Sequence, residues 1–202
     1  MAAPQLYLMT PPDAEPARFE RVLMATLNGP QVAALLVRRG TQDDEAYAVL
    51  AARLVEIGQA AGAAVLVEDD SALAGRIGAD GVHVTQGGTE TIRAASAALK
   101  PDGIVGVGNI RSRHDAMSFG ELDVDYLLFG GLDGDPDPQA VELAQWWAET
   151  FEVPAILSNP AADPAQALAS TAEFVGLGDA IWRAENPAAA LAAFARALGE
   201  PA

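Results

Sequence analysis

Eight short apolar runs recur along the chain and alternate with longer Ala- and Leu-rich segments, in repeating units of about 25 residues. The runs are continuous rather than interrupted at every second position, which is typical of strands buried on both faces of a parallel sheet. Eight such units in succession predict an α/β fold, a single-domain (β/α)8 TIM barrel, and an open doubly wound sheet is the alternative. The predicted strands are residues 6–9, 32–37, 64–67, 81–84, 104–107, 126–129, 155–157 and 174–177.

The segments between these runs carry the periodicity of amphipathic helices. Residues 43–61, 140–150 and 187–198 place apolar side chains three and four positions apart, as expected of helices that bury one face. The last of them is preceded by Asn186 and begins with Pro187, a helix N-cap followed by proline at the first helical position.

Chain length and composition favour one globular domain. The 202 residues fall short of the usual size of such a barrel, about 250 residues. Loops should therefore be short. Half of the residues are hydrophobic, which is enough for a sizeable core. No linker or low-complexity tract divides the sequence, so we expect a single domain over residues 1–202.

Charge and composition also exclude several classes of partner. The formal net charge is −16, a value that repels nucleic acid phosphates and anionic lipid. No cysteine is present to form a disulfide or a thiolate zinc site. The sequence shows no secretory signal pattern and no apolar stretch of about 18 residues. We therefore expect a cytoplasmic protein with neither nucleic acid nor a membrane as partner.

Chemistry in such a barrel is expected where each strand ends. Arg38 and Arg39 follow the second predicted strand, and adjacent arginines there favour phosphate binding, with two solvated side chains as the alternative. Asp69 follows the third strand and could ligate Mg²⁺, or else Asp69 or Asp70 caps the next helix.

Glycines at other strand ends would let a ligand approach the backbone closely. They are Gly106 and Gly108 at the end of the fifth predicted strand and directly after it, Gly130 after the sixth and Gly178 after the eighth. We predict that all four contribute to ligand binding.

The order of elements around residues 78–86, G-A-D-G-V-H-V-T-Q, resembles the thiamine phosphate synthases and their relatives, the thiazole tautomerases. A strand, the Asp69–Asp70 pair and a short helix precede this stretch. A second element, formed by Asp125, Tyr126 and Gly130, is similar to the family's D-Y-x-x-x-G. The resemblance covers most of the chain and implies a small (β/α)8 barrel.

The family resemblance implies a magnesium-dependent site, but this chain differs from the family at part of that site. Asp69 matches the first metal ligand and Gln86 matches a binding glutamine, whereas Gly87 and Gly88 replace the acidic pair that follows. The synthases have a serine where this chain has Gly108. We expect weak or no Mg²⁺ binding in the absence of a ligand.

Two further positions depart from the family pattern. The loop after the sixth strand carries Asp133 and Asp135 and lacks the family's lysine. Aspartates there should repel phosphate. The tautomerases' histidine aligns with Ile110, and His114 is expected on the solvent side of the next helix.

Three functions follow from the resemblance. The first is synthesis of thiamine phosphate from hydroxymethylpyrimidine pyrophosphate and thiazole phosphate, with Arg39, Asp69 and Gln86 as surviving parts. The second is a repurposed or catalytically impaired barrel that binds a small phosphorylated ligand or a partner. The third is thiazole tautomerase. We expect little synthase turnover.

Trp146 and Trp147 are adjacent in the sequence, which suggests that one packs inward and the other faces a partner. A homo-oligomer is therefore one possibility that the sequence allows.

Overall fold

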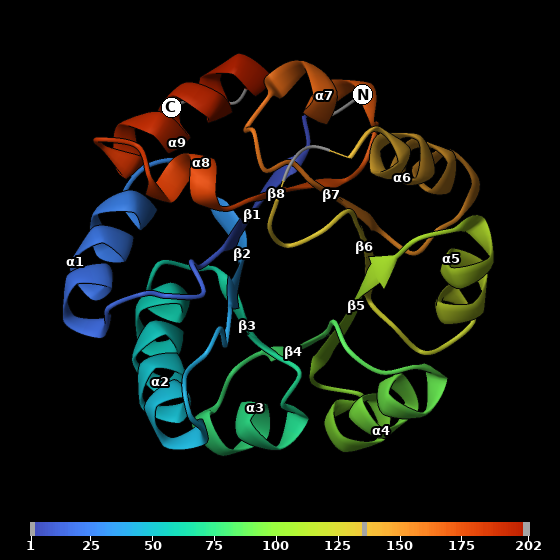
Figure 1. Ribbon diagram of the computed structural model, residues 1–202, viewed down its shortest axis with the longest axis horizontal. Helices are drawn as coiled ribbons and strands as arrows, with labels where there is room; N and C mark the ends of the chain where they lie inside the picture. Colours follow the sequence, from blue (N-terminus) through green and yellow to red (C-terminus); the bar gives the residue numbers. More distant parts are fainter. Residues whose placement is uncertain (1–2, 135–136, 200–202) are drawn as a thin grey trace.

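Eight parallel strands close into a barrel with helices on its outside (Figure 1). The computed structural model describes residues 3–134 and 137–199, so Asp135 and the ends of the predicted domain lie outside the described residues. Each strand pairs with the next in sequence, and β8 pairs with β1 in parallel register to complete the circle. The predicted barrel is confirmed and the open sheet is excluded. The strands are β1 Gln5–Met9, β2 Val32–Val37, β3 Ala64–Glu68, β4 Gly81–Val84, β5 Ile104–Ile110, β6 Tyr126–Phe129, β7 Ala155–Ser158 and β8 Phe174–Leu177.

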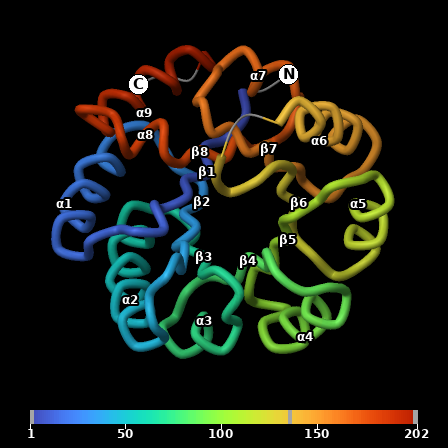
Figure 2. Tube along the Cα trace, in the orientation of Figure 1, coloured from blue at the N-terminus to red at the C-terminus, as the bar shows by residue number. Residues whose placement is uncertain are grey.

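The Cα trace winds once around the barrel, each strand leading to a helix on the outer side (Figure 2). Asn186 caps α9 as predicted, and Asp43 caps α2, which therefore begins one residue later than expected. None of the described helices is long and apolar enough to cross a membrane. The helices are α1 Pro16–Leu27, α2 Asp44–Ala60, α3 Ser71–Ile77, α4 Thr89–Leu99, α5 Arg113–Gly120, α6 Pro138–Thr150, α7 Pro164–Ala169, α8 Asp179–Trp182 and α9 Pro187–Leu198.

Strand β5 extends three residues beyond its predicted end at Val107. Its register with β6 shifts between Val107 and Ile110, where Ile110 pairs with Phe129. Asn109, inside this irregular stretch, has a φ of 58°. The pairing resumes after the irregularity, and the strand therefore carries a polar residue to the rim of the barrel.

Carboxylates tie the amino-terminal ends of neighbouring strands together. Asp80, just before β4, accepts a hydrogen bond from the β3 amide of Val65 at 2.7 Å. Asp125 does the same between β5 and β6, at 2.6 Å, and Glu173 does so between β7 and β8, at 2.8 Å. The aspartates of both family-like sequence elements therefore serve the end of the barrel that contributes to stability rather than to chemistry.

The barrel interior holds an apolar layer in which two tyrosines and one histidine are embedded. Tyr7 and Tyr126 share a hydrogen bond of 2.9 Å between their hydroxyl groups, and both rings are buried. Gly106 makes room for this arrangement, since a Cβ atom there would lie 1.8 Å from Cζ of Tyr126. The predicted ligand-binding glycine is thus required by packing.

We predict that Gly106→Ala lowers the free energy of unfolding by about 1–3 kcal/mol or more, because the new methyl group overpacks the interior. Gly75→Ala is the control: its Cβ would meet no atom within 4 Å, and it lies inside helix α3, where alanine is preferred. Urea unfolding of both variants measures the difference. Equal stability of Gly106→Ala and the wild type would show that Tyr126 does not occupy this space.

Candidate functional site

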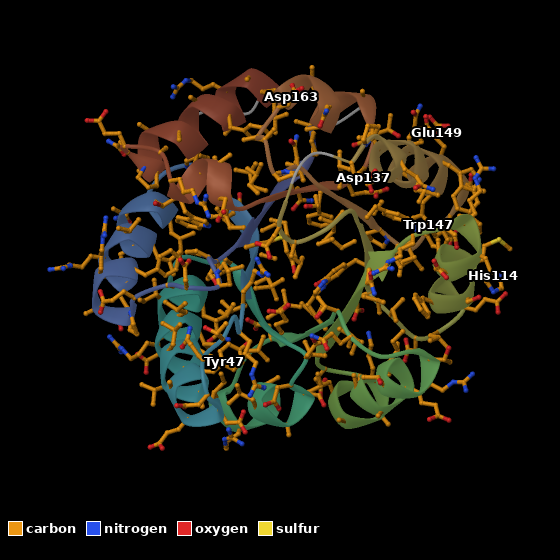
Figure 3. The ribbon with its side chains drawn as sticks, viewed as in Figure 1. Tyr47, His114, Asp137, Trp147, Glu149 and Asp163 are labelled. Carbon is orange, nitrogen blue, oxygen red and sulfur yellow. The ribbon has the colours of Figure 1, made fainter. Side chains whose placement is uncertain are left out.

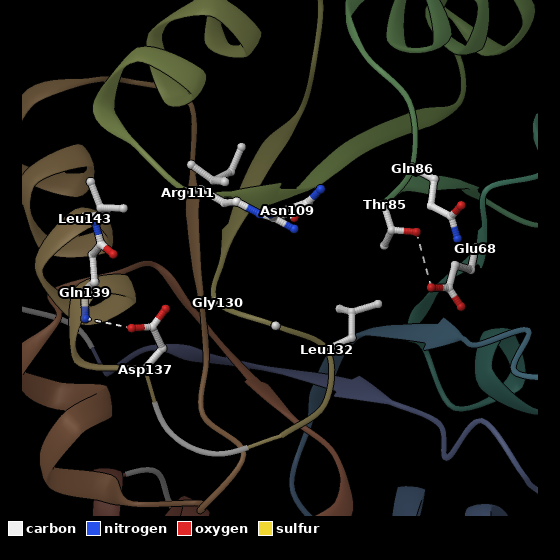
Figure 4. A pocket seen from close by; sticks show the side chains of 12 residues that line it. Glu68, Thr85, Gln86, Asn109, Arg111, Gly130, Leu132, Asp137, Gln139 and Leu143 are labelled. Atoms are coloured by element: carbon white, nitrogen blue, oxygen red, sulfur yellow. Dashed lines mark hydrogen bonds between the residues drawn. The ribbon is translucent and has the colours of Figure 1, made fainter.

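A cavity of about 610 Å³ opens at the carboxyl ends of β3 to β6, where barrels of this type carry their active sites (Figure 4). Its wall combines hydrogen-bonding groups with apolar side chains, a mixture that suits a small polar ligand with an apolar part. The lining residues are Glu68, Thr85, Gln86, Asn109, Ile110, Arg111, Gly130, Gly131, Leu132, Asp137, Gln139 and Leu143.

Asn109 and Arg111 bring hydrogen-bond donors to the wall, and Arg111 also brings a positive charge. Both are exposed, and Nε of Arg111 donates to Oδ1 of Asn109 at 2.9 Å. Arg111 also borders a neighbouring cavity of about 270 Å³ that reaches Gly108. Neither residue is among those predicted from the sequence. The signal available was a polar Asn at the end of an apolar strand, directly before a basic residue.

Arg38 is held by an internal ion pair instead of facing solvent. Only 8% of the residue is exposed, and its Nη1 and Nη2 donate to the two carboxylate oxygens of Asp133 at 2.5 and 2.7 Å. Glu68 approaches Nε at 3.9 Å. The hydrogen bonds from Arg38 lower the pKa of Asp133, so this carboxylate stays ionised and balances the buried cation.

Arg39 points elsewhere, although it is adjacent to Arg38. Its guanidinium bonds to Asp44 at the start of α2 and lies 5.6 Å from the ring centre of Tyr47. Its backbone amide donates to Glu68 at 2.9 Å. The two arginines that the sequence placed side by side thus have different partners, and their role in phosphate binding stays a prediction.

Asp69 organises the segment that follows β4. Its Oδ1 accepts from the backbone amides of Thr85 and Gln86 at 2.6 and 3.1 Å, and the Thr85 hydroxyl donates to its Oδ2. Asp69 has a φ of 54°, an uncommon conformation for a residue with a side chain. Asp70, not Asp69, caps helix α3 by accepting from Leu73 at 2.8 Å.

These carboxylates do not fit a Mg²⁺ ion as they stand. Magnesium in proteins takes oxygen ligands in near-octahedral geometry. Both oxygens of Asp69 already accept hydrogen bonds, Oε2 of Glu68 accepts one from the Arg39 amide, and Gly87 offers no side chain. Within residues 3–134 and 137–199, no three His, Cys, Asp or Glu side chains are grouped so that they could hold a metal. The affinity for Mg²⁺ stays a prediction.

His83 lies on β4 with its side chain inside the barrel. Its Nδ1 is 2.8 Å from the hydroxyl group of Tyr126, and the side chain is fully buried. A Cβ atom at Gly108 would lie 2.7 Å from its Nε2, which has no partner among the described residues. Burial, helped by the charge of Arg38, lowers the pKa of His83 to about 3, so the ring is neutral at physiological pH.

The remaining predicted ligand residues divide into two groups. Gln86 and Gly130 line the cavity, and Gly130 has a φ of 93° that favours glycine. Gly178 lies elsewhere, next to Met9, as the N-cap of the four-residue helix α8. His114 is exposed on the outer side of α5, as expected, and therefore takes no part in the cavity (Figure 3).

One of the two adjacent tryptophans packs inward, as the sequence suggested. Trp147 is buried and stacks on Phe151, with ring centres 4.0 Å apart, while Trp146 is only partly buried. A partner for Trp146 stays a prediction.

We predict that His83 makes the folded state sensitive to acid. Below the ordinary histidine pKa of 6.5 the unfolded chain binds a proton that folded His83 refuses until about pH 3, so stability falls as pH drops through that window. The free energy of unfolding should fall by about 2 kcal/mol more between pH 7 and pH 5 in wild type than in His83→Gln. His114→Gln, at the surface, should keep the wild-type pH dependence. An identical pH dependence in His83→Gln would contradict a buried neutral histidine.

Known proteins resemble this chain both in sequence and in fold. A family model described as thiamine monophosphate synthase matches residues 6–180. The thiamine-phosphate synthase of Rhodospirillum centenum is 36% identical over 202 aligned residues, covering 96% of this chain and 97% of the relative. That of Erythrobacter litoralis is 35% identical, covering 92% and 91%. The structure of thiamine phosphate pyrophosphorylase from Pyrococcus furiosus superposes with a TM-score of 0.81 at 18% identity, covering 96% of this chain and 95% of that one.

Proposed function

The chain belongs to the thiamine monophosphate synthase family, and from that premise we propose that its cavity binds a small phosphorylated compound and that it turns over the family's substrates slowly. The observation that carries the proposal is the composition of the cavity wall. Arg111, Asn109 and the amide side chains of Gln86 and Gln139 are hydrogen-bond donors around one space, in a chain whose net charge is −16.

Apolar groups supply the other half of the proposed recognition. Ile110, Leu132 and Leu143 line the same cavity as the donors. A ligand that joins a phosphate to a small ring would place its charge near Arg111 and its ring against these side chains. Such a ligand is of the class that the family's reaction uses, namely a phosphorylated thiazole or pyrimidine.

Slow turnover is supported by how the polar groups at the mouth are engaged. Departure of pyrophosphate requires donors and cations that are oriented toward the developing charge. Arg38 is bound to Asp133, Asp69 is bound to the Thr85 segment, and Gly108 carries no hydroxyl group. No lysine occurs between Gly130 and Gln139.

Full synthase activity is the second candidate, favoured by relatives with that name that are similar over nearly the whole chain. It requires the Arg38 and Asp69 contacts to be exchanged for contacts with substrate. The two candidates differ in rate, which an assay measures directly.

We predict that purified protein, given both phosphorylated substrates and Mg²⁺, forms thiamine phosphate more slowly than about 0.1 s⁻¹, below the range of ordinary enzymes. The synthase from Rhodospirillum centenum, assayed in parallel, shows that the substrates and conditions support turnover. A rate at or above this threshold would establish the second candidate and end the proposal of impaired chemistry.

We predict that Arg111→Gln weakens the binding of pyrophosphate by roughly tenfold or more, because one charge-assisted hydrogen bond is removed. Arg113→Gln is the matched control, since Arg113 lies two residues away and packs 4.7 Å from the ring centre of Trp146 instead of lining the cavity. Calorimetric titration of both variants separates a specific contact from a change in net charge. Equal affinities would exclude Arg111 from the site.

A further inference from the structure

We infer that Asp133 is a specificity-determining residue: its carboxylate occupies Arg38 in the manner of a bound anion, and an anionic ligand must displace it to reach this guanidinium. The inference rests on the proposed function, because it concerns the same cavity. It assigns Asp133, a residue of this chain's own loop, the role of an internal competitor.

The geometry of the pair is that of an arginine with an anionic ligand. Two parallel hydrogen bonds, of 2.5 and 2.7 Å, join the guanidinium to both oxygens of Asp133. Arginine uses the same planar fork to bind phosphate. Nη1 also lies 3.5 Å from the carbonyl oxygen of Leu132, and Leu132 lines the cavity. The guanidinium therefore borders the cavity through Leu132 and is not itself part of the cavity wall.

The two partners differ in how easily they can leave. The Arg38 side chain is 10% exposed, whereas the Asp133 side chain is 55% exposed. Rotation of the Asp133 side chain returns its carboxylate to water, while Arg38 stays in place. Among the residues that the structure describes, Nε of Arg38 is buried without a hydrogen-bond partner and lies 3.9 Å from Glu68. The guanidinium therefore keeps one unsatisfied donor while Asp133 is bound.

Competition from Asp133 selects ligands by charge. A carboxylate ligand would only exchange one negative charge for another, whereas a phosphate group carries about −1.5 to −2 and three acceptor oxygens. Glu68 lies 3.9 Å from Nε of Arg38 and would still balance part of its charge after the exchange. The cavity should therefore accept phosphates and reject carboxylates of similar size.

Removing the charge of Asp133 tests this role. In Asp133→Asn we expect pyrophosphate to bind roughly tenfold more tightly than in the wild type, measured by calorimetric titration, because Arg38 becomes available. The gain should vanish in the double variant Arg38→Gln, Asp133→Asn. Glu56→Gln is the matched control, since it removes one negative charge that pairs with Arg53 on α2, away from the cavity.

Asp133→Ser provides a second neutral variant, and its folding is checked by thermal unfolding. Unchanged or weaker pyrophosphate affinity in both folded variants, with measurable binding by the wild type, would overturn the inference and leave the proposed function standing. An equal gain in Glu56→Gln would also overturn it, because overall charge would then explain the effect. If neither the wild type nor any variant binds pyrophosphate, the proposed function fails as well.

Discussion

The ion pair between Arg38 and Asp133 joins the end of β2 to the segment after β6 across the mouth of the barrel. A buried arginine without a partner would be strongly destabilising, so some anion has to meet it. In this chain the anion is the carboxylate of Asp133, a residue of the same protein. The same pattern extends to Asp69, which binds the Thr85 segment, and to Arg39, which binds Asp44. Polar residues that a ligand or metal could contact thus hold the mouth of the barrel together.

Below this network the barrel depends on how three polar rings fit among apolar side chains. Tyr7, Tyr126 and His83 form one hydrogen-bonded row, and glycines on β5 leave the space for it. Gly106 and Gly108 resemble ligand-binding glycines in sequence, but their lack of a side chain already has a cause in packing. One position can serve both purposes, because Gly108 also borders the smaller cavity.

Much of the fold could be predicted from the sequence because its signal is local and repeated. Continuous apolar runs indicated all eight strands, and the Asn186–Pro187 pair indicated the start of α9. The site was less predictable. Arg38 and Asp133 are 95 residues apart, and no local pattern shows that they pair. The extension of β5 depends on a positive φ at Asn109, which only the pairing with β6 reveals, so the contribution of Arg111 was missed.

We infer that the mouth of this barrel is an anion site in which the carboxylate of Asp133 occupies the deeper arginine, Arg38. A crystal structure of the protein with pyrophosphate tests it most directly. We expect pyrophosphate in the cavity against Arg111 and Asn109, with the Asp133 carboxylate turned away from Arg38 and a phosphate oxygen in its place. Pyrophosphate bound elsewhere, or seated in the cavity while Asp133 keeps both hydrogen bonds to Arg38, would contradict it.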